Sequence, residues 1–90
     1  MFQILVVEDD AELNRTVCAY LNQNGYKATG CLNASDAYDA MYAVMYDLII
    51  SDIMMPEIDG FDFAKTVRGL NSEIPILFMS ARDDIMSKEK

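Results

Sequence analysis

Two short apolar runs without polar alternation constrain the fold of this sequence more than any other feature. Residues 4–7 read ILVV, residues 48–51 read LIIS with the small Ser51 as their one polar member, and an acidic residue follows each run at once. A strand with one face in water alternates apolar and polar side chains, whereas a strand covered on both faces is apolar throughout. Both runs therefore predict buried strands in a sheet that carries helices on each face.

Segments with helical periodicity lie between the predicted strands. The first helix is expected to begin after a capping Asp10 and to stop near Gly25. Its apolar positions recur every four residues and are Leu13, Val17 and Leu21, with polar Asn14, Arg15 and Gln23 between them. The second helix opens at residues 35–36, and its expected apolar stripe is Ala37, Ala40, Met41, Val44 and Met45. The third follows the loop at residues 53–60, and its expected inward positions are Phe61, Ala64, Val67 and Leu70. Residues 26–30 and 74–79 supply two further strand candidates.

The alternation of strands and helices predicts βαβ units, which form a parallel sheet in a single α/β domain. Ninety residues are enough for one such domain and too few for two. Right-handed crossovers place the C-terminal ends of the strands along one edge of the sheet, where such folds bind ligands. Glu8, Asp9, Asp52 and Ser80 each follow or end a predicted strand. We therefore expect three carboxylates and a hydroxyl group to converge at this edge.

The charge balance narrows the possible partners and ligands. Fifteen Asp and Glu residues against seven Lys and Arg residues give a net charge of −8, and the chain has no His. Such a chain is not attracted to nucleic-acid phosphates or to anionic membranes. Without His, it lacks both the most common general base and the most common nitrogen ligand of metals. Chemistry based on carboxylates is therefore favoured.

The two cysteines and the short apolar runs indicate where in the cell the protein resides. Cys18 and Cys31 form neither a CxxC motif nor a disulfide framework, and we interpret both as small buried apolar side chains. No apolar run approaches a signal-peptide core or the roughly 20 residues that span a bilayer. A cytoplasmic location without membrane insertion is expected.

Three carboxylates at one edge favour a divalent cation that offsets their mutual repulsion. Carboxylate and carbonyl oxygens suit Mg²⁺ better than Zn²⁺. Asp52 can then act as a nucleophile and form an aspartyl-phosphate, with Ser80 hydrogen-bonded to a phosphoryl oxygen. The alternative is that acids after strands only cap the following helices. We adopt it for Asp10 but not for Glu8, Asp9 and Asp52.

Three stretches of the sequence occur in a distinctive order and spacing. They are residues 4–10 (ILVVEDD), 47–60 (DLIISDIMMPEIDG) and 75–82 (PILFMSAR). Together they resemble the receiver domain of two-component response regulators, above all those with a winged-helix DNA-binding output domain. The resemblance extends over the whole chain. It implies a flavodoxin-like, doubly wound parallel sheet, here with four strands in the order 2-1-3-4.

The resemblance also implies roles at the edge of the sheet. Asp52 would accept a phosphoryl group from a phosphohistidine on a sensor histidine kinase, or from a small donor such as acetyl phosphate. Asp9 and Asp52 would bind Mg²⁺, with Mn²⁺ as an alternative. Glu8 would act largely through a bound water, and the main-chain carbonyl of Met54 would complete the protein ligands.

Residues of two loops would complete the switch that the resemblance implies. Ser80 would turn its hydroxyl group toward the phosphoryl group, and the small Ala81 would leave room beside it. The loop after the phosphoryl acceptor would be shaped by Pro56, Asp59 and Gly60.

The family pattern continues into a fifth strand ending in Lys-Pro and a fifth helix, and neither has a counterpart in the 90 residues. We therefore expect residues 1–90 to be a receiver domain truncated at its C-terminus, without that lysine and without an output domain. Residues 76–79 would then form an exposed apolar edge. This predicts a homodimer or higher oligomer, formed by edge pairing or by exchange of the segment from residue 80 onward. Phosphotransfer would be weakened.

Two other functions stay open beside the phosphoryl-accepting module. One is a structural or dimerisation fragment of a receiver that is not phosphorylated. The other is a Mg²⁺-dependent phosphohydrolase, which usually needs a second acid two residues after its nucleophile, where this chain has Met54. Flavin binding is disfavoured because residues 8–10 are acidic where a phosphate-binding loop needs hydroxyl groups and glycine. The expected role is signalling, not catalysis on an external substrate.

Overall fold

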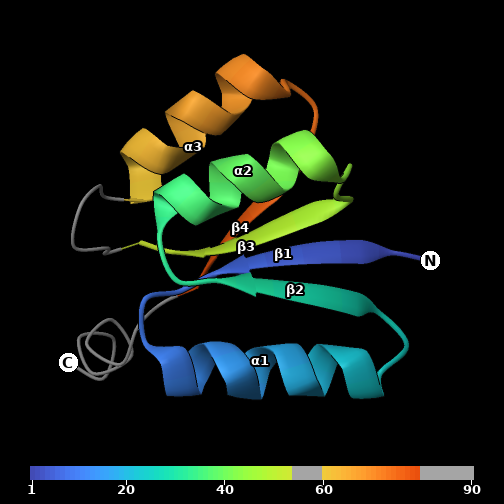
Figure 1. Ribbon diagram of the computed structural model, residues 1–90. Helices are drawn as coiled ribbons and strands as arrows, with labels where there is room; N and C mark the ends of the chain where they lie inside the picture. The colour runs from blue at the N-terminus through green and yellow to red at the C-terminus, as the bar shows by residue number, and fades with distance from the viewer. Residues whose placement is uncertain (54–59, 80–90) are drawn as a thin grey trace, which may run out of the picture.

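The computed structural model describes residues 1–53 and 60–79, which form strands and helices in strict alternation (Figure 1). The elements are β1 (Gln3–Val7), α1 (Ala11–Gln23), β2 (Lys27–Cys31), α2 (Ala34–Ala43), β3 (Leu48–Asp52), α3 (Gly60–Leu70) and β4 (Ile76–Met79). This order matches the βαβ pattern expected from the sequence.

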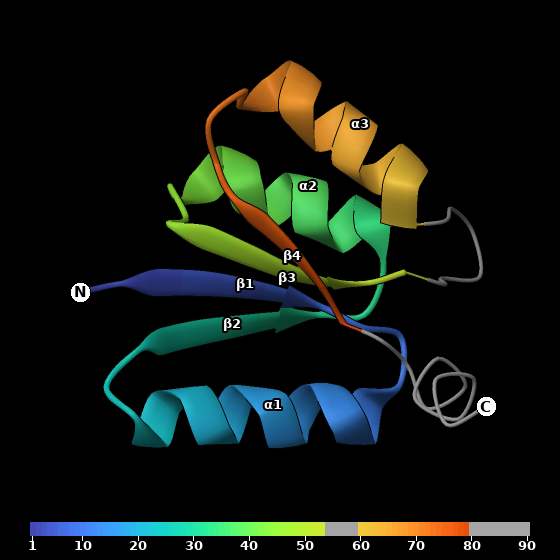
Figure 2. The ribbon, with the colours of Figure 1, turned by 180° about the vertical axis from the view of Figure 1, so that it is seen from behind.

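The sheet is parallel and its strand order is β2-β1-β3-β4. The predicted flavodoxin-like order is therefore confirmed. Helix α1 covers one face of the sheet, while α2 and α3 cover the other (Figures 1 and 2). In the paired register, Val7 at the end of β1 lies beside Ser51 near the end of β3. This places the residues that follow β1 next to the last residue of β3.

Each face of the sheet has its own apolar core, because alternate residues of a strand point to opposite faces. Ile4, Val6 and Ile50 are buried on the side of α1, against the partly buried Val17 and Leu21. On the side of α2 and α3, a larger cluster consists of Leu5, Val7, Cys31, Ala34, Ala37, Tyr46, Ile49, Phe63, Val67 and Ile74. The prediction that β1 and β3 are covered on both faces is thus confirmed.

The inward face of α3 differs from the prediction. Phe61 is 64% exposed and Leu70 is 44% exposed, whereas Phe63 and Val67 are fully buried. The Phe63 ring stacks on Tyr38 of α2 with 5.6 Å between ring centroids. Two aromatic residues only two positions apart point to nearly opposite sides of a helix, so only one of them can enter the core. Packing against α2 selects Phe63.

The ends of several elements also differ from the prediction. Helix α2 begins at Ala34 because the side chain of Asn33 accepts a hydrogen bond from the Asp36 backbone N–H at 2.7 Å. It ends before Val44, which is extended, so the side chain of Met45 is 83% exposed and does not join the stripe. Strand β2 lies one residue later than expected, and β4 begins at Ile76 because Pro75 has no N–H group for a strand ladder.

Helix α1 ends where expected, and the cysteines behave as apolar side chains. Gly25, just beyond its C-cap Asn24, has a φ angle of 90°, which glycine adopts without strain. Cys31 is buried, Cys18 is partly buried, and both are free thiols. Burial raises the pKa of Cys31 to about 11, which keeps the thiol protonated and unreactive near neutral pH. Within the described ranges, every helix is too short or too polar to cross a membrane.

Candidate functional site

Three carboxylates meet at the C-terminal edge of the sheet. Glu8 and Asp9 directly follow β1, and Asp52 is the last residue of the neighbouring strand β3. Because the two strands are parallel and in register, their carboxyl ends place these acids side by side. One ligand oxygen from each of the three carboxylates lies within 4.8 Å of the others. The predicted convergence of Glu8, Asp9 and Asp52 is therefore present in the structure.

The three acids differ in their exposure. Glu8 is 1% exposed and Asp52 is 3% exposed, whereas Asp9 is open to solvent. Burial raises the pKa of Glu8 to about 7, and a hydrogen bond with Asp9 and the charges of Asp52 and Asp9 add to the rise. The Asp10 backbone N–H opposes it by donating to Glu8 Oε2 at 2.8 Å. The cluster thus concentrates negative charge that a bound cation would offset.

Asp10 has a different structural role from Glu8 and Asp9. Its Oδ1 accepts hydrogen bonds from the backbone N–H groups of Glu12 and Leu13, both at 3.1 Å. This is the geometry of a helix N-cap, and it satisfies two donors that α1 cannot satisfy internally. The sequence prediction that Asp10 caps the helix is confirmed.

The chemistry of the donor set fits a hard divalent cation. The donors are three carboxylates, and the chain contains no imidazole. Mg²⁺ prefers such oxygen ligands and keeps several waters, while a Zn²⁺ site needs nitrogen or sulfur ligands. The cluster also has one solvent-exposed member, Asp9, so water and a phosphoryl donor have a side from which to approach.

Several predicted site residues lie outside the described part of the chain. These are Met54, Pro56, Asp59, Ser80 and Ala81. Gly60 is described and is the first residue of α3.

One buried polar residue near the site was not identified from the sequence. Asn14 was named only as a polar residue between the apolar positions of α1, but it faces the sheet and is 5% exposed. With Val17, Cys18 and Leu21 it occupies positions i, i+3, i+4 and i+7, which form one face of a helix. A single polar residue on that otherwise apolar face was the signal that could have identified it.

The sequence of this chain matches a known protein family. Residues 4–90 match the family model described as the response regulator receiver domain. The chain belongs to this family. The predicted resemblance is thereby confirmed, and receiver domains are signalling modules with an acidic metal site at this edge.

Relatives and solved structures agree with this assignment. The chain is 40% identical over 80 residues to the transcriptional regulatory protein RprY of Bacteroides fragilis, covering 89% of this chain and 34% of RprY. The receiver domain of HemR from Leptospira biflexa superposes with a TM-score of 0.83 at 28% identity, covering 99% of this chain and 75% of that one.

A third likeness is to a protein that has been solved with a kinase. In the complex of the histidine kinase ThkA with the response regulator TrrA of Thermotoga maritima, the matching chain has a TM-score of 0.83 and 31% identity. The match covers 90% of this chain and 70% of the other. The chain thus spans about a third of the length of its curated relative RprY and 75% of the solved HemR receiver domain.

Proposed function

We propose that this receiver domain accepts a phosphoryl group on Asp52, with Mg²⁺ held by Glu8, Asp9 and Asp52. The observation that carries the proposal is the convergence of these carboxylates within 4.8 Å at the C-terminal ends of β1 and β3. A bound Mg²⁺ supplies positive charge that offsets the carboxylates and the charge spread over the transferring phosphoryl group. Mn²⁺ has similar ligand preferences and is expected to substitute for it.

The transfer itself is a displacement at phosphorus. An Oδ atom of Asp52 forms a bond to phosphorus while the donor's P–N bond in phosphohistidine, or its P–O bond in acetyl phosphate, breaks. The imidazole or acetate leaves with the electron pair of that bond. The burial of Asp52 limits the access of water to the reacting oxygen, and the exposed side of Asp9 leaves an approach for the donor.

The donor that we propose is a sensor histidine kinase. The complex of TrrA with the kinase ThkA supports this partner, since TrrA shares the fold of this chain at 31% identity. The relation to RprY supports a role in transcriptional regulation through an output region of the whole protein. The net charge of −8 argues against direct nucleic-acid or membrane binding by these 90 residues, and a cytoplasmic location is part of the proposal.

The remaining predicted site residues are part of the same proposal. The Met54 carbonyl would complete the metal ligands, and Ser80, beside the small Ala81, would hydrogen-bond the phosphoryl group. The loop with Pro56, Asp59 and Gly60 would connect the acceptor to α3. Because Met54 stands where hydrolases carry a second acid, the aspartyl-phosphate would serve as a signal and not as a turnover intermediate.

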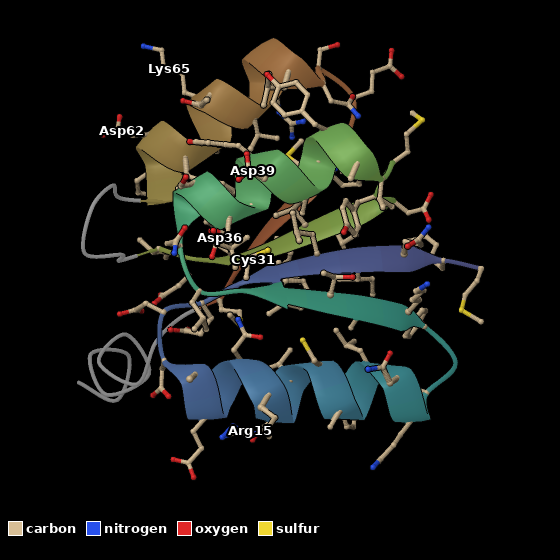
Figure 3. The ribbon with its side chains drawn as sticks, viewed as in Figure 1. Arg15, Cys31, Asp36, Asp39, Asp62 and Lys65 are labelled. Carbon is tan, nitrogen blue, oxygen red and sulfur yellow. The ribbon has the colours of Figure 1, made fainter. Side chains whose placement is uncertain are left out.

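A comparison of two isosteric variants tests the proposal. The full chain is incubated with acetyl phosphate and Mg²⁺, and phosphorylation is followed by intact-mass spectrometry. We expect a modified species that EDTA prevents and that Asp52→Asn abolishes. Asp39→Asn removes the same charge from the exposed surface of α2 (Figure 3) and should leave the modification unchanged. Equal modification of Asp52→Asn and the original chain would overturn the proposal.

A second candidate function is self-association through β4. Among the described strands, β4 lies at the edge of the sheet beside β3, and its Leu77 side chain is 57% exposed. Apolar edge strands recruit further strands, so a homodimer or larger oligomer, by edge pairing or by exchange of the segment from residue 80 onward, is the expected consequence. Light scattering at micromolar concentration should give a mass above 10.1 kDa, and a monomeric mass would contradict this.

A further inference from the structure

The buried carboxamide of Asn14 joins helix α1 to the main chain beside the acidic cluster. Its Nδ2 donates to the Cys31 carbonyl at 2.9 Å and to the Glu8 carbonyl at 3.1 Å, with the Val6 carbonyl further away at 3.4 Å. Its Oδ1 accepts from Cys18 Sγ at 3.4 Å. An amide nitrogen has two hydrogens, so the two shorter contacts account for both.

These acceptors lie where two strands end. Cys31 is the last residue of β2, and its carbonyl also accepts a hydrogen bond from the Glu8 backbone N–H at 3.0 Å. Glu8 is the first residue after β1. Asn14 therefore holds the peptide group after Glu8 against the end of β2, at the point where the chain leaves the sheet. Arg15, its neighbour on α1, points away from the sheet (Figure 3).

The neighbouring strand has space for this carboxamide because residue 30 is glycine. A Cβ atom at Gly30 would lie 2.1 Å from Asn14 Oδ1 and 3.2 Å from Cys18 Sγ. Heavy atoms that are not bonded to each other cannot approach to 2.1 Å, so any larger residue would displace the carboxamide. The position of Asn14 and the absence of a side chain at residue 30 thus depend on each other.

We infer that Asn14 is a positioning residue for the metal site. It fixes the main chain of Glu8, while the Asp10 N–H holds Glu8 Oε2, and together these bonds orient the Glu8 carboxylate toward Asp9 and Asp52. The inference rests on the proposed function, because it assigns Asn14 to the Mg²⁺ site of that proposal. Loss of groups that orient metal ligands typically weakens metal binding by about 10-fold to 100-fold.

The test measures Mg²⁺ affinity in the full chain by titration, followed by tyrosine fluorescence or calorimetry. Asn14→Ala should weaken Mg²⁺ binding by about tenfold. Gly30→Ala should weaken it as well, since it displaces the carboxamide without removing it. In the double variant the steric conflict is gone, so the second change should add little to the first. Asn14→Ser, which retains one donor, should fall between the original chain and Asn14→Ala.

Two controls separate positioning from a general loss of stability. Val67→Ala creates a cavity on the opposite face of the sheet and should lower the free energy of unfolding while leaving Mg²⁺ affinity unchanged. Cys18→Ala removes the thiol contact but not the carbonyl contacts, and should also leave the affinity unchanged. Phosphorylation of Asn14→Ala by acetyl phosphate should return to the original rate at saturating Mg²⁺, which a merely unstable chain would not do.

The outcomes that overturn the inference differ from those that overturn the proposed function. Unchanged Mg²⁺ affinity in Asn14→Ala, or in Asn14→Ser where Asn14→Ala does not fold, overturns the inference alone. A loss of affinity in Val67→Ala as large as that in Asn14→Ala also overturns it. If the original chain itself fails to bind Mg²⁺, the proposed function and the role of Asn14 both fail.

Discussion

At the scale of the single residue, the carboxylate of Glu8 loses its contact with water when the chain folds. Burial raises its pKa from 4.5 to about 7 in the metal-free fold. Between these values the folded chain holds a proton that the unfolded chain releases, so the free energy of unfolding falls as the pH rises. The fall contributed by Glu8 runs from its unfolded pKa of 4.5 through its folded pKa of about 7.

The variant Glu8→Gln isolates this contribution, because it retains the shape of the side chain and removes its charge. The free energy of unfolding is measured by urea titration in EDTA at about pH 5 and at about pH 8. Its decrease from the lower to the higher pH should be larger for the original chain than for Glu8→Gln. Parallel pH profiles for the two chains would contradict the assignment of this pH dependence to Glu8.

At the scale of the element, the packing of α3 depends on which of its two phenylalanines enters the core. Phe63 is fully buried and stacks on Tyr38, so Phe63→Ala should cost about 3–5 kcal/mol of unfolding free energy. Phe61 is 64% exposed and contacts Phe78 at a ring-centroid distance of 5.3 Å, so Phe61→Ala should cost about 1 kcal/mol. Urea titration of both variants is the measurement. Equal costs would mean that the two rings are buried alike.

The sequence predicted the type and order of the elements because their patterns are local. The apolar runs of β1 and β3 are compatible only with strands that are covered on both faces. The acids that follow these strands must then lie at the C-terminal edge of the sheet. The inward face of α3 was not predictable in this way. Phe61 and Phe63 are equally apolar, and the choice between them depends on Tyr38, which lies more than 20 residues earlier.

The site residues were likewise predictable where the signal is local in the sequence, and not where it depends on distant residues. Glu8, Asp9 and Asp52 were found because each directly follows or ends a predicted strand. Asn14 was missed because a single polar residue in a helix ordinarily faces water. Its burial depends on the carbonyl of Cys31 and on the missing side chain of Gly30, both of which belong to another strand.

At the scale of the whole molecule, the acidic edge links metal binding to stability. The chain carries a net charge of −8, and three of its carboxylates share one small region. Without a cation, mutual repulsion among these carboxylates opposes folding. A cation that binds only the folded chain stabilises it by about 2.7 kcal/mol at a concentration of 100 times its dissociation constant.

Asp9 offers the sharpest test of this linkage because its side chain is exposed, so its replacement disturbs packing least. In EDTA, Asp9→Asn should unfold at a higher temperature than the original chain, because one charge of the repelling cluster is gone. Added Mg²⁺ should raise the melting temperature of the original chain but hardly that of Asp9→Asn. Asp39→Asn removes a charge from the exposed surface of α2, outside the cluster of three carboxylates, and should retain the full Mg²⁺ effect. If Mg²⁺ raised the melting temperature of Asp9→Asn as much as that of the original chain, this carboxylate would be excluded from the metal site.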